Sequence, residues 1–323
     1  MKPAISVILL TTLIGAGQGL FLAWFSAELF ALLSILPPQR GGGIAAAGLS
    51  LVLLVAGLIA SFFHLGHPER AWRAAAMWRT SWLSREVILL PLTMALIAVY
   101  AWLPQAGLNS AVFILGNGKV VTLSTLVGLA ALFSVLALFI CTAMIYTCLK
   151  FLRQWHSPLT VLNFLLMGSA SGFTLAATQA SILERGPVDY FVGAAMLLTL
   201  LALATRYASL SRNRRLRSPS SLQSAIGVHH PTIRQLAQGA MGGSFNTRAF
   251  IHGYGPQIVR LARRFFLLAG FIAPLVLLAM YQQSAALFCS LAFVLQLLGL
   301  LAERWYFFIE AEHPQNVYYQ MIS

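Results

Sequence analysis

Hydrophobic positions run along this chain in long stretches that short polar segments separate. A helix needs roughly 20 apolar residues to cross a bilayer, because its backbone must satisfy its own hydrogen bonds in hydrocarbon. Such stretches lie at about residues 4–36, 44–63, 84–104, 120–149, 158–182, 187–208, 265–280 and 285–308. The pattern predicts an all-α integral membrane protein, a single bundle of about eight transmembrane helices that occupies residues 1–323.

Composition agrees with this fold class. The chain is 59% hydrophobic and 9% charged, a balance that no water-soluble globular domain needs. The first apolar stretch is about twice as long as the core of a secretory signal, roughly 7 to 15 residues, so we expect it to remain as a spanning helix. Within it, Gly15 and Gly19 form a pattern that favours close helix contact, and Glu28 is expected to reach the headgroups.

Lysine and arginine are concentrated on one side of the predicted bundle. With an even number of spans both termini share a side, and the opposite side keeps only Arg40, Lys119 and Arg185 of the 21 basic residues. Because positive charge stays in the cytoplasm, we expect both termini to be cytoplasmic. The formal net charge of +13 then reflects topology and contact with membrane lipids, and we expect no nucleic-acid partner.

The chain lacks the usual ligands of a redox metal. Its three cysteines, Cys141, Cys148 and Cys289, are too few for the four ligands of an iron-sulfur cluster or a structural zinc ion. Six of its seven histidines fall in predicted loops or tails, whereas a membrane cytochrome b needs histidines that face each other inside the bilayer. We therefore expect no metal site and no haem.

One segment, residues 61–87, concentrates polar and aromatic side chains between the second and third apolar stretches. His64 closes the second stretch, and a glycine and a proline then turn the chain away. The pattern that follows indicates a short helix at the interface, within a cytoplasmic loop of residues 65–84. Ser84 is predicted to be the N-cap of the third helix, which places Glu86 in its first turn.

His64 and Glu86 lie at the same predicted membrane depth. Each has a simpler interpretation, since a histidine can cap a helix end and a glutamate can complement a helix dipole. Together, however, they place an imidazole and a carboxylate beside a hydrocarbon wall. A quinol loses two protons with its two electrons, so its site needs proton acceptors and an apolar slot. The pair therefore favours a quinone site.

The block around this pair resembles a known family. It reads HLGHP at residues 64–68, RAWR at 70–73 and SWLSRE at 81–86, and it is similar to the anchor subunits of dimethyl sulfoxide reductase type enzymes. The resemblance implies a haem-free, eight-helix anchor that binds quinone, either ubiquinone or menaquinone. It also implies an iron-sulfur partner subunit and a molybdenum catalytic subunit, which alone carry the iron-sulfur clusters and the molybdenum cofactor.

The resemblance also implies roles for individual residues. His64 and Glu86 match the histidine and the glutamate of the family's quinone site, and Glu303 matches a further family position. Gln18 is expected to hydrogen-bond a quinone carbonyl or, alternatively, a neighbouring helix. Glu303 is expected to point into the bundle or else to be solvated, with Arg304 toward headgroups or a partner. The catalytic pair is His64 and Glu86, and the full predicted quinone-binding set is His64, Glu86, Gln18, Ser84, Arg85 and Glu303.

Orientation selects a branch of this family. Anchors of dimethyl sulfoxide reductases present their termini to the periplasm, whereas this sequence predicts the opposite. The runs HLGHPERAW, FNTRAF at residues 245–250 and EHPQNVYYQ at the C-terminus resemble the anchors of cytoplasm-facing sulfite dehydrogenases. We therefore expect a multi-pass protein of the bacterial cytoplasmic (inner) membrane that passes electrons from sulfite to quinone, with its catalytic partners on the cytoplasmic side. An anchor of a dimethyl sulfoxide, polysulfide or thiosulfate reductase type complex is the alternative.

Partner docking is expected on two cytoplasmic segments, the interfacial loop and a long basic loop at residues 209–262. A connection this long inside a compact bundle is usually functional or disordered. Its arginine cluster suits anionic lipid, and its second half suits an iron-sulfur subunit. The predicted docking residues are Arg70, Arg73, Trp72, Arg79, Arg248 and His252.

Two other classes of protein compete with this interpretation. A secondary transporter also has many helices broken by glycine, but it usually keeps charged groups near the membrane midplane. Here the charges sit at the edges of the predicted spans, which weakens that reading. A haem-bearing cytochrome is the other alternative, and the positions of the histidines argue against it.

Overall fold

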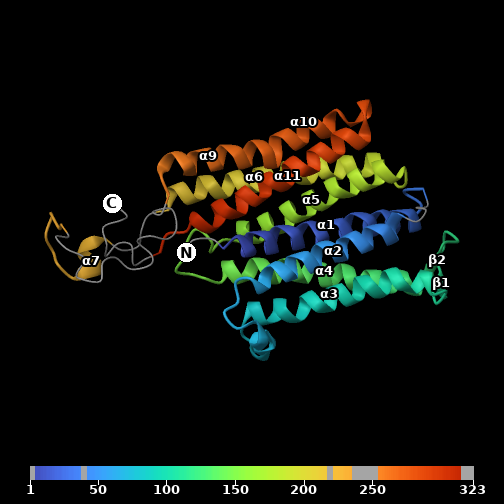
Figure 1. Ribbon diagram of the computed structural model, residues 1–323, viewed down its shortest axis with the longest axis horizontal. Coiled ribbons are helices and arrows are strands. Elements are labelled where there is room, and N and C mark those ends of the chain that lie inside the picture. The colour runs from blue at the N-terminus through green and yellow to red at the C-terminus, as the bar shows by residue number, and fades with distance from the viewer. Residues whose placement is uncertain (1–3, 38–41, 217–220, 235–253, 314–323) are drawn as a thin grey trace.

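The structure is a computed structural model that describes residues 4–37, 42–216, 221–234 and 254–313. In these ranges eight helices are long and apolar enough to cross a membrane. They lie side by side in one elongated bundle (Figure 1). The predicted all-α fold with about eight transmembrane helices is therefore confirmed.

The spanning helices follow the predicted order along the chain. They are α1 (Ile5–Leu32), α2 (Gly42–Phe62), α3 (Trp82–Gln105), α4 (Leu123–Thr147), α5 (Pro158–Leu183), α6 (Val188–Arg215), the continuous unit of α9 (Pro256–Leu267), the π-helical η3 (Leu268–Ile272) and α10 (Ala273–Ala279), and α11 (Ala285–Ile309). The shorter elements are the 3-10 helix η1 (Pro68–Met77), strands β1 (Ala111–Ile114) and β2 (Val120–Thr122), α7 (Leu222–Ile226) and η4 (Tyr281–Gln283).

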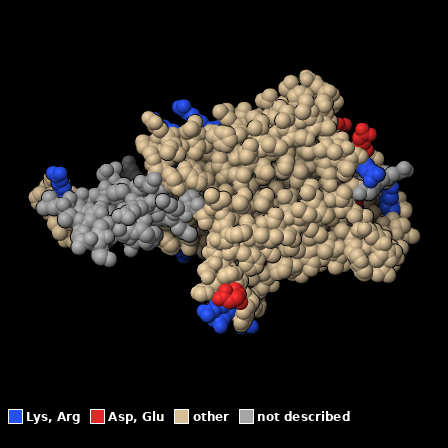
Figure 2. Space-filling model, viewed as in Figure 1, with Lys and Arg blue, Asp and Glu red and all other residues tan. Residues whose placement is uncertain are grey.

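The two ends of the bundle differ. Helix α1 begins and α11 ends at the end that also carries η1, which we call the terminal end (Figure 1). The antiparallel pair β1–β2 lies at the opposite end, which we call the hairpin end. Charged side chains gather near these two ends, and a broad uncharged surface lies between them (Figure 2). This distribution is what a bilayer-spanning bundle requires, because isolated charges are costly in hydrocarbon.

Helices α1 and α5 form the centre of the bundle. A Cβ atom on Gly19 would lie 2.2 Å from the carbonyl oxygen of Gly168, and one on Gly172 would lie 2.0 Å from the backbone carbon of Gly19. No side chain fits at such distances. The backbones of α1 and α5 can touch only because Gly19 on α1 faces Gly168 and Gly172 on α5. The predicted close contact at the glycine pattern of the first helix is confirmed.

Helix boundaries depart from the apolar stretches in several places. Helix α4 begins at Leu123 and not near residue 120, because residues 120–122 form β2. Helix α6 continues to Arg215, and the seventh span begins at Pro256 in place of residue 265. Helical hydrogen bonds continue outside hydrocarbon, so arginine-bearing turns extend both helices beyond their apolar parts. The predicted loop of residues 209–262 is shorter as a result.

Candidate functional site

His64 and Glu86 lie on one lateral cavity at the terminal end. This lateral cavity has a volume of about 510 Å³ and is bounded by α1, the end of α2, η1 and α3. Apolar side chains dominate its wall, which also includes Leu10, Phe62, Trp72 and Leu90. Sites for small organic ligands typically have volumes of 300–1,000 Å³ and mostly apolar walls with a few polar groups.

The chain reaches this arrangement through two short local structures. His64 lies in the turn after α2, two residues beyond Phe62 at the end of that helix. The helix α3 begins at Trp82, and its N-cap is Ser81, whose hydroxyl accepts a hydrogen bond from the Ser84 backbone N–H at 3.3 Å. The prediction of Ser84 as N-cap is therefore wrong. Because the cap lies three residues earlier, Glu86 falls in the second turn and not the first.

The imidazole of His64 forms part of the wall of the lateral cavity. Partial burial lowers the pKa of His64 below that of a free histidine, because the charged form loses hydration there. The ring is therefore neutral over more of the physiological pH range than an ordinary histidine. A neutral imidazole both donates and accepts a hydrogen bond, which suits proton exchange with a bound ligand.

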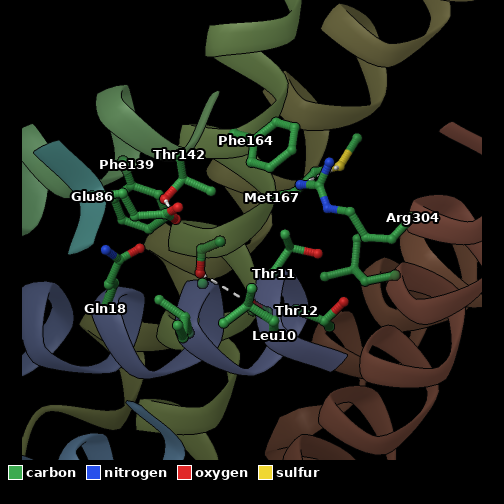
Figure 3. Close-up of a pocket in the computed structure, with 15 residues that line it drawn as sticks. Leu10, Thr11, Thr12, Gln18, Glu86, Phe139, Thr142, Phe164, Met167 and Arg304 are labelled. Atoms are coloured by element: carbon green, nitrogen blue, oxygen red, sulfur yellow. Dashed lines mark hydrogen bonds between the residues drawn. The ribbon is translucent and has the colours of Figure 1, made fainter. Parts of the chain in front are cut away.

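Glu86 also lines a second space, which we call the inner cavity. This inner cavity of about 20 Å³ lies inside the bundle and is lined by residues of α1, α3, α4, α5 and α11. The hydroxyl of Thr142 donates a hydrogen bond to Glu86 Oε1. Figure 3 shows Glu86 and Gln18 on one side of this space and Arg304 on the other, with Thr11 and Thr12 between them. Glu86 thus lies between a lateral, mostly apolar cavity and an internal one whose wall has several polar groups.

The other predicted quinone-binding residues occupy different places. Gln18 is 1% exposed and lines the inner cavity, and its Nε2 has no hydrogen-bond partner among the described residues. Arg85 donates to the backbone oxygens of Trp78 and Arg79 at 2.9 and 2.8 Å, so it ties the turn after η1 to α3. Neither Arg85 nor Ser84 belongs to the described lining of the two cavities.

Glu303 takes part in a buried ion network near the terminal end. Its Oε1 lies 2.8 Å from Arg206 Nε and its Oε2 lies 3.5 Å from Arg304 Nη1. Arg206 also pairs with Glu310 at 3.3 Å. Glu303 points into the bundle, but the expectation that Arg304 points outward is wrong, since Arg304 is 4% exposed. Its guanidinium carbon lies 3.7 Å from the ring centroid of Phe164, a cation–π contact that offsets part of the desolvation.

Two of these functional candidates were missed from the sequence. In the sequence Arg206 was used only in the count of basic residues that predicts the topology. Its position directly after the apolar run LLALAT is the signal that could have indicated burial. Thr142 gives no signal, because a threonine inside an apolar helix usually bonds its own backbone.

The predicted docking residues of η1 are exposed at the terminal end. Trp72 is 72% exposed, and the guanidinium of Arg73 lies 5.7 Å from its ring centroid. The charged knob that projects from the lower edge in Figure 2 occupies the position of η1 in Figure 1. Arg248 and His252, and the FNTRAF run with them, lie outside the described residues.

A further cavity of about 260 Å³ lies at the hairpin end. Glu28 lines it together with Trp24 and Tyr100, and the Tyr100 hydroxyl donates a hydrogen bond to Glu28 Oε2. Tyr100 thus holds the Glu28 carboxylate against the bundle at this end, and contact of Glu28 with the headgroups stays a prediction.

These features are those of a membrane bundle with a largely apolar lateral cavity beside an exposed aromatic and basic helix, and comparison with known proteins adds the family. The family model described as "DMSO reductase anchor subunit (DmsC)" matches residues 1–309, so the chain belongs to the DMSO reductase anchor subunit family. Over 325 aligned residues, the whole of both chains, it is 50% identical to a sulfite dehydrogenase subunit of Allochromatium vinosum. The family resemblance predicted from the block at residues 64–86 is confirmed.

Proposed function

We propose that this chain is the quinone-reactive membrane anchor of a sulfite-oxidising complex. The observation that carries the proposal is the lateral cavity, whose mostly apolar wall includes both an imidazole and a carboxylate. The wall suits the ring and tail of ubiquinone or menaquinone. The two polar groups suit the proton exchange that must accompany two-electron transfer to the ring.

The roles of the two residues follow from their environments. Reduction of a quinone consumes two electrons and two protons, and the electrons come from an iron-sulfur partner subunit. Glu86 gives a proton to one quinone oxygen, and its carboxylate is held in place by Thr142. His64, on the wall of the same cavity, exchanges the proton at the other oxygen. The opposite direction of electron flow uses the same groups in reverse.

The terminal end is the side on which the partners dock in this proposal. Trp72, Arg73 and their neighbours on η1 stand exposed next to the lateral cavity, so a cluster held there lies near the ligand. The bias of lysine and arginine puts this end in the cytoplasm of a bacterial inner membrane. An iron-sulfur subunit and a molybdenum catalytic subunit are the expected partners, and sulfite is the expected substrate because the relative from Allochromatium vinosum is a sulfite dehydrogenase subunit.

The test uses the assembled complex, purified through this chain and assayed for sulfite oxidation with a quinone and with a soluble artificial acceptor. Glu86→Gln and His64→Ala should each lower quinone-coupled turnover by about 100-fold or more, because each removes a proton-exchanging group. Turnover with the soluble acceptor should stay unchanged, since those electrons bypass the lateral cavity.

Glu184→Gln is the matched control, because Glu184 is an exposed carboxylate at the end of α5, away from η1 and with no place in the cavity wall. Its complex should behave as wild type with both acceptors. Normal quinone turnover in both cavity variants would refute the proposed site. Purification of this chain without iron-sulfur and molybdenum subunits would refute the anchor function itself.

A further inference from the structure

The inner cavity behind Glu86 has the dimensions of a water site. Its volume of about 20 Å³ exceeds the roughly 10–15 Å³ that a single buried water requires. A water also needs two to four polar partners, and the wall supplies the Glu86 carboxylate, the Gln18 amide and the hydroxyl of Ser171. Arg304 closes the far side (Figure 3).

The hydrogen bonds of the wall leave places for such a water. The hydroxyls of Thr11, Thr12 and Ser171 donate to backbone oxygens of their own helices, so their oxygens remain free to accept. The amide nitrogen of Gln18 is buried and has no partner among the described residues. Buried donors are normally satisfied by protein or by ordered water, and the inner cavity offers the second route.

We propose that an ordered water in the inner cavity exchanges protons with Glu86, so that the carboxylate is reprotonated from inside the bundle while the quinone occupies the lateral cavity. This inference rests on the proposed function. When the Glu86 carboxyl group gives its proton, its O–H bond breaks and an O–H bond forms on the quinone oxygen. The electrons arrive from the iron-sulfur partner. The water then passes a proton to the carboxylate and regains one from the terminal end.

The direction of exchange follows from the charges around the inner cavity. On the far side, Arg304 is paired with Glu303, which is paired with Arg206, and Arg206 reaches Glu310. The Glu310 side chain is 12% exposed, so the network leads from the cavity toward the surface of the terminal end. Guanidinium groups keep their protons, so Arg206 and Arg304 hold the carboxylates in position by pairing with them. The carboxylates and the water pass the proton.

The route toward the hairpin end is closed by aromatic rings. Phe21 and Phe25, which follow Gln18 along α1, are stacked with centroids 5.6 Å apart. The ring of Tyr100 lies edge-on to both, at 5.6 and 5.8 Å. Phe21 and Phe25 are 2% and 1% exposed, so this aromatic block separates the inner cavity from Glu28 beyond it.

A steric variant tests the water directly. A Cβ atom at Gly15, which lines the inner cavity, would meet only the Cα atom of Gly168, at the ordinary contact distance of 3.5 Å. Gly15→Ala should therefore assemble normally and fill the water site. We expect its quinone-coupled kcat to fall by at least about tenfold with the quinone KM within about twofold of wild type. Gly48→Ala on α2, where a Cβ atom meets no described atom within 4 Å, should leave both unchanged.

A second pair of variants tests the position of the carboxylate. Thr142→Val keeps the shape of the side chain and removes the hydroxyl that donates to Glu86, whereas Thr142→Ser keeps the hydroxyl. Thr142→Val should lower kcat and raise the solvent deuterium isotope effect on quinone-coupled turnover, and Thr142→Ser should restore both. Turnover with the soluble acceptor should stay at wild type in every variant.

Two results would overturn the inference. One is wild-type kcat in both Gly15→Ala and Thr142→Val, which would show that Glu86 is reprotonated elsewhere. The other is a raised quinone KM at unchanged kcat, which would make the inner cavity part of quinone binding. Should Gly15→Ala fail to assemble, the threonine pair decides. Failure of the proposed function itself is separate, since it appears as quinone turnover that survives Glu86→Gln.

Discussion

Burial of charge dominates the chemistry of single residues in this protein. Arg206 and Glu303 are each 1% exposed, and Arg304 is 4% exposed, in helices that mostly bury apolar side chains. Two cations therefore depend on the carboxylates of Glu303 and Glu310. Removal of one partner from a buried ion pair leaves an uncompensated charge, which is far more destabilising than the pair was stabilising.

Glu303→Gln should lower the free energy of unfolding by about 3–5 kcal/mol, because it leaves both arginines short of a counter-charge. Thermal unfolding of the detergent-solubilised complex measures the effect. Glu69→Gln serves as the surface comparison, since the Glu69 side chain is 62% exposed and should change the midpoint little. Equal midpoints for the two variants would show that Glu303 is not a stabilising counter-ion.

Whether the surroundings of a single residue could be predicted from the sequence depends on the kind of contact. The position of His64 and Glu86 on one cavity could be predicted, since both lie at predicted span ends on one side of the membrane and are joined by a short segment. The burial of Arg304 could not, because its partners come from α5 and from the network that Arg206 brings from α6. Such a pairing exists only after the helices are packed, and no local pattern encodes it.

Among the elements, helix pairs are held by close backbone contact. Helices α1 and α5 approach at Gly19 and Gly172, and η3 approaches α11 at Gly270 and Gly299. A Cβ atom on Gly299 would lie 2.1 Å from the Gly270 backbone nitrogen. In hydrocarbon the hydrophobic effect does not drive helices together. The helix pairs are therefore held by close backbone packing at these glycines and by the dispersion energy that this packing allows.

Gly172→Ala should therefore destabilise the bundle by about 1–3 kcal/mol or prevent its assembly, because the new methyl group overlaps the backbone of α1. Gly193→Ala on α6 is the matched control, since a Cβ atom there meets no described atom within 4 Å. The yield of folded complex and its unfolding midpoint give the comparison. A Gly172→Ala protein as stable as Gly193→Ala would contradict the close contact.

The order of spanning helices could be predicted because each needs its own long apolar run. Their ends could not, because helical hydrogen bonds continue where hydrophobicity stops, as in the arginine-bearing turns of α6 and α9. The pair β1–β2 was missed as well. Strands of 4 and 3 residues are too short to display an alternating pattern.

For the whole molecule, the charge bias of its two ends makes a topological prediction. Basic residues favour the cytoplasm, so the C-terminus should face the cytoplasm and the hairpin end the periplasm. A C-terminal green fluorescent protein fusion should fluoresce, and alkaline phosphatase inserted at Gly118, in the turn between β1 and β2, should be active. Active phosphatase at the C-terminus, with none at Gly118, would reverse the orientation and remove the reason for placing the catalytic partners inside the cell.

Helix η1 belongs to two surfaces at once. Its residues Ala71, Trp72 and Ala74 line the lateral cavity, while Trp72 is also 72% exposed to the outside. A partner subunit bound to the exposed side of η1 and a ligand in the lateral cavity therefore contact the same short helix. If binding of either one shifts η1, thermodynamic linkage requires each to change the affinity of the other by the same factor.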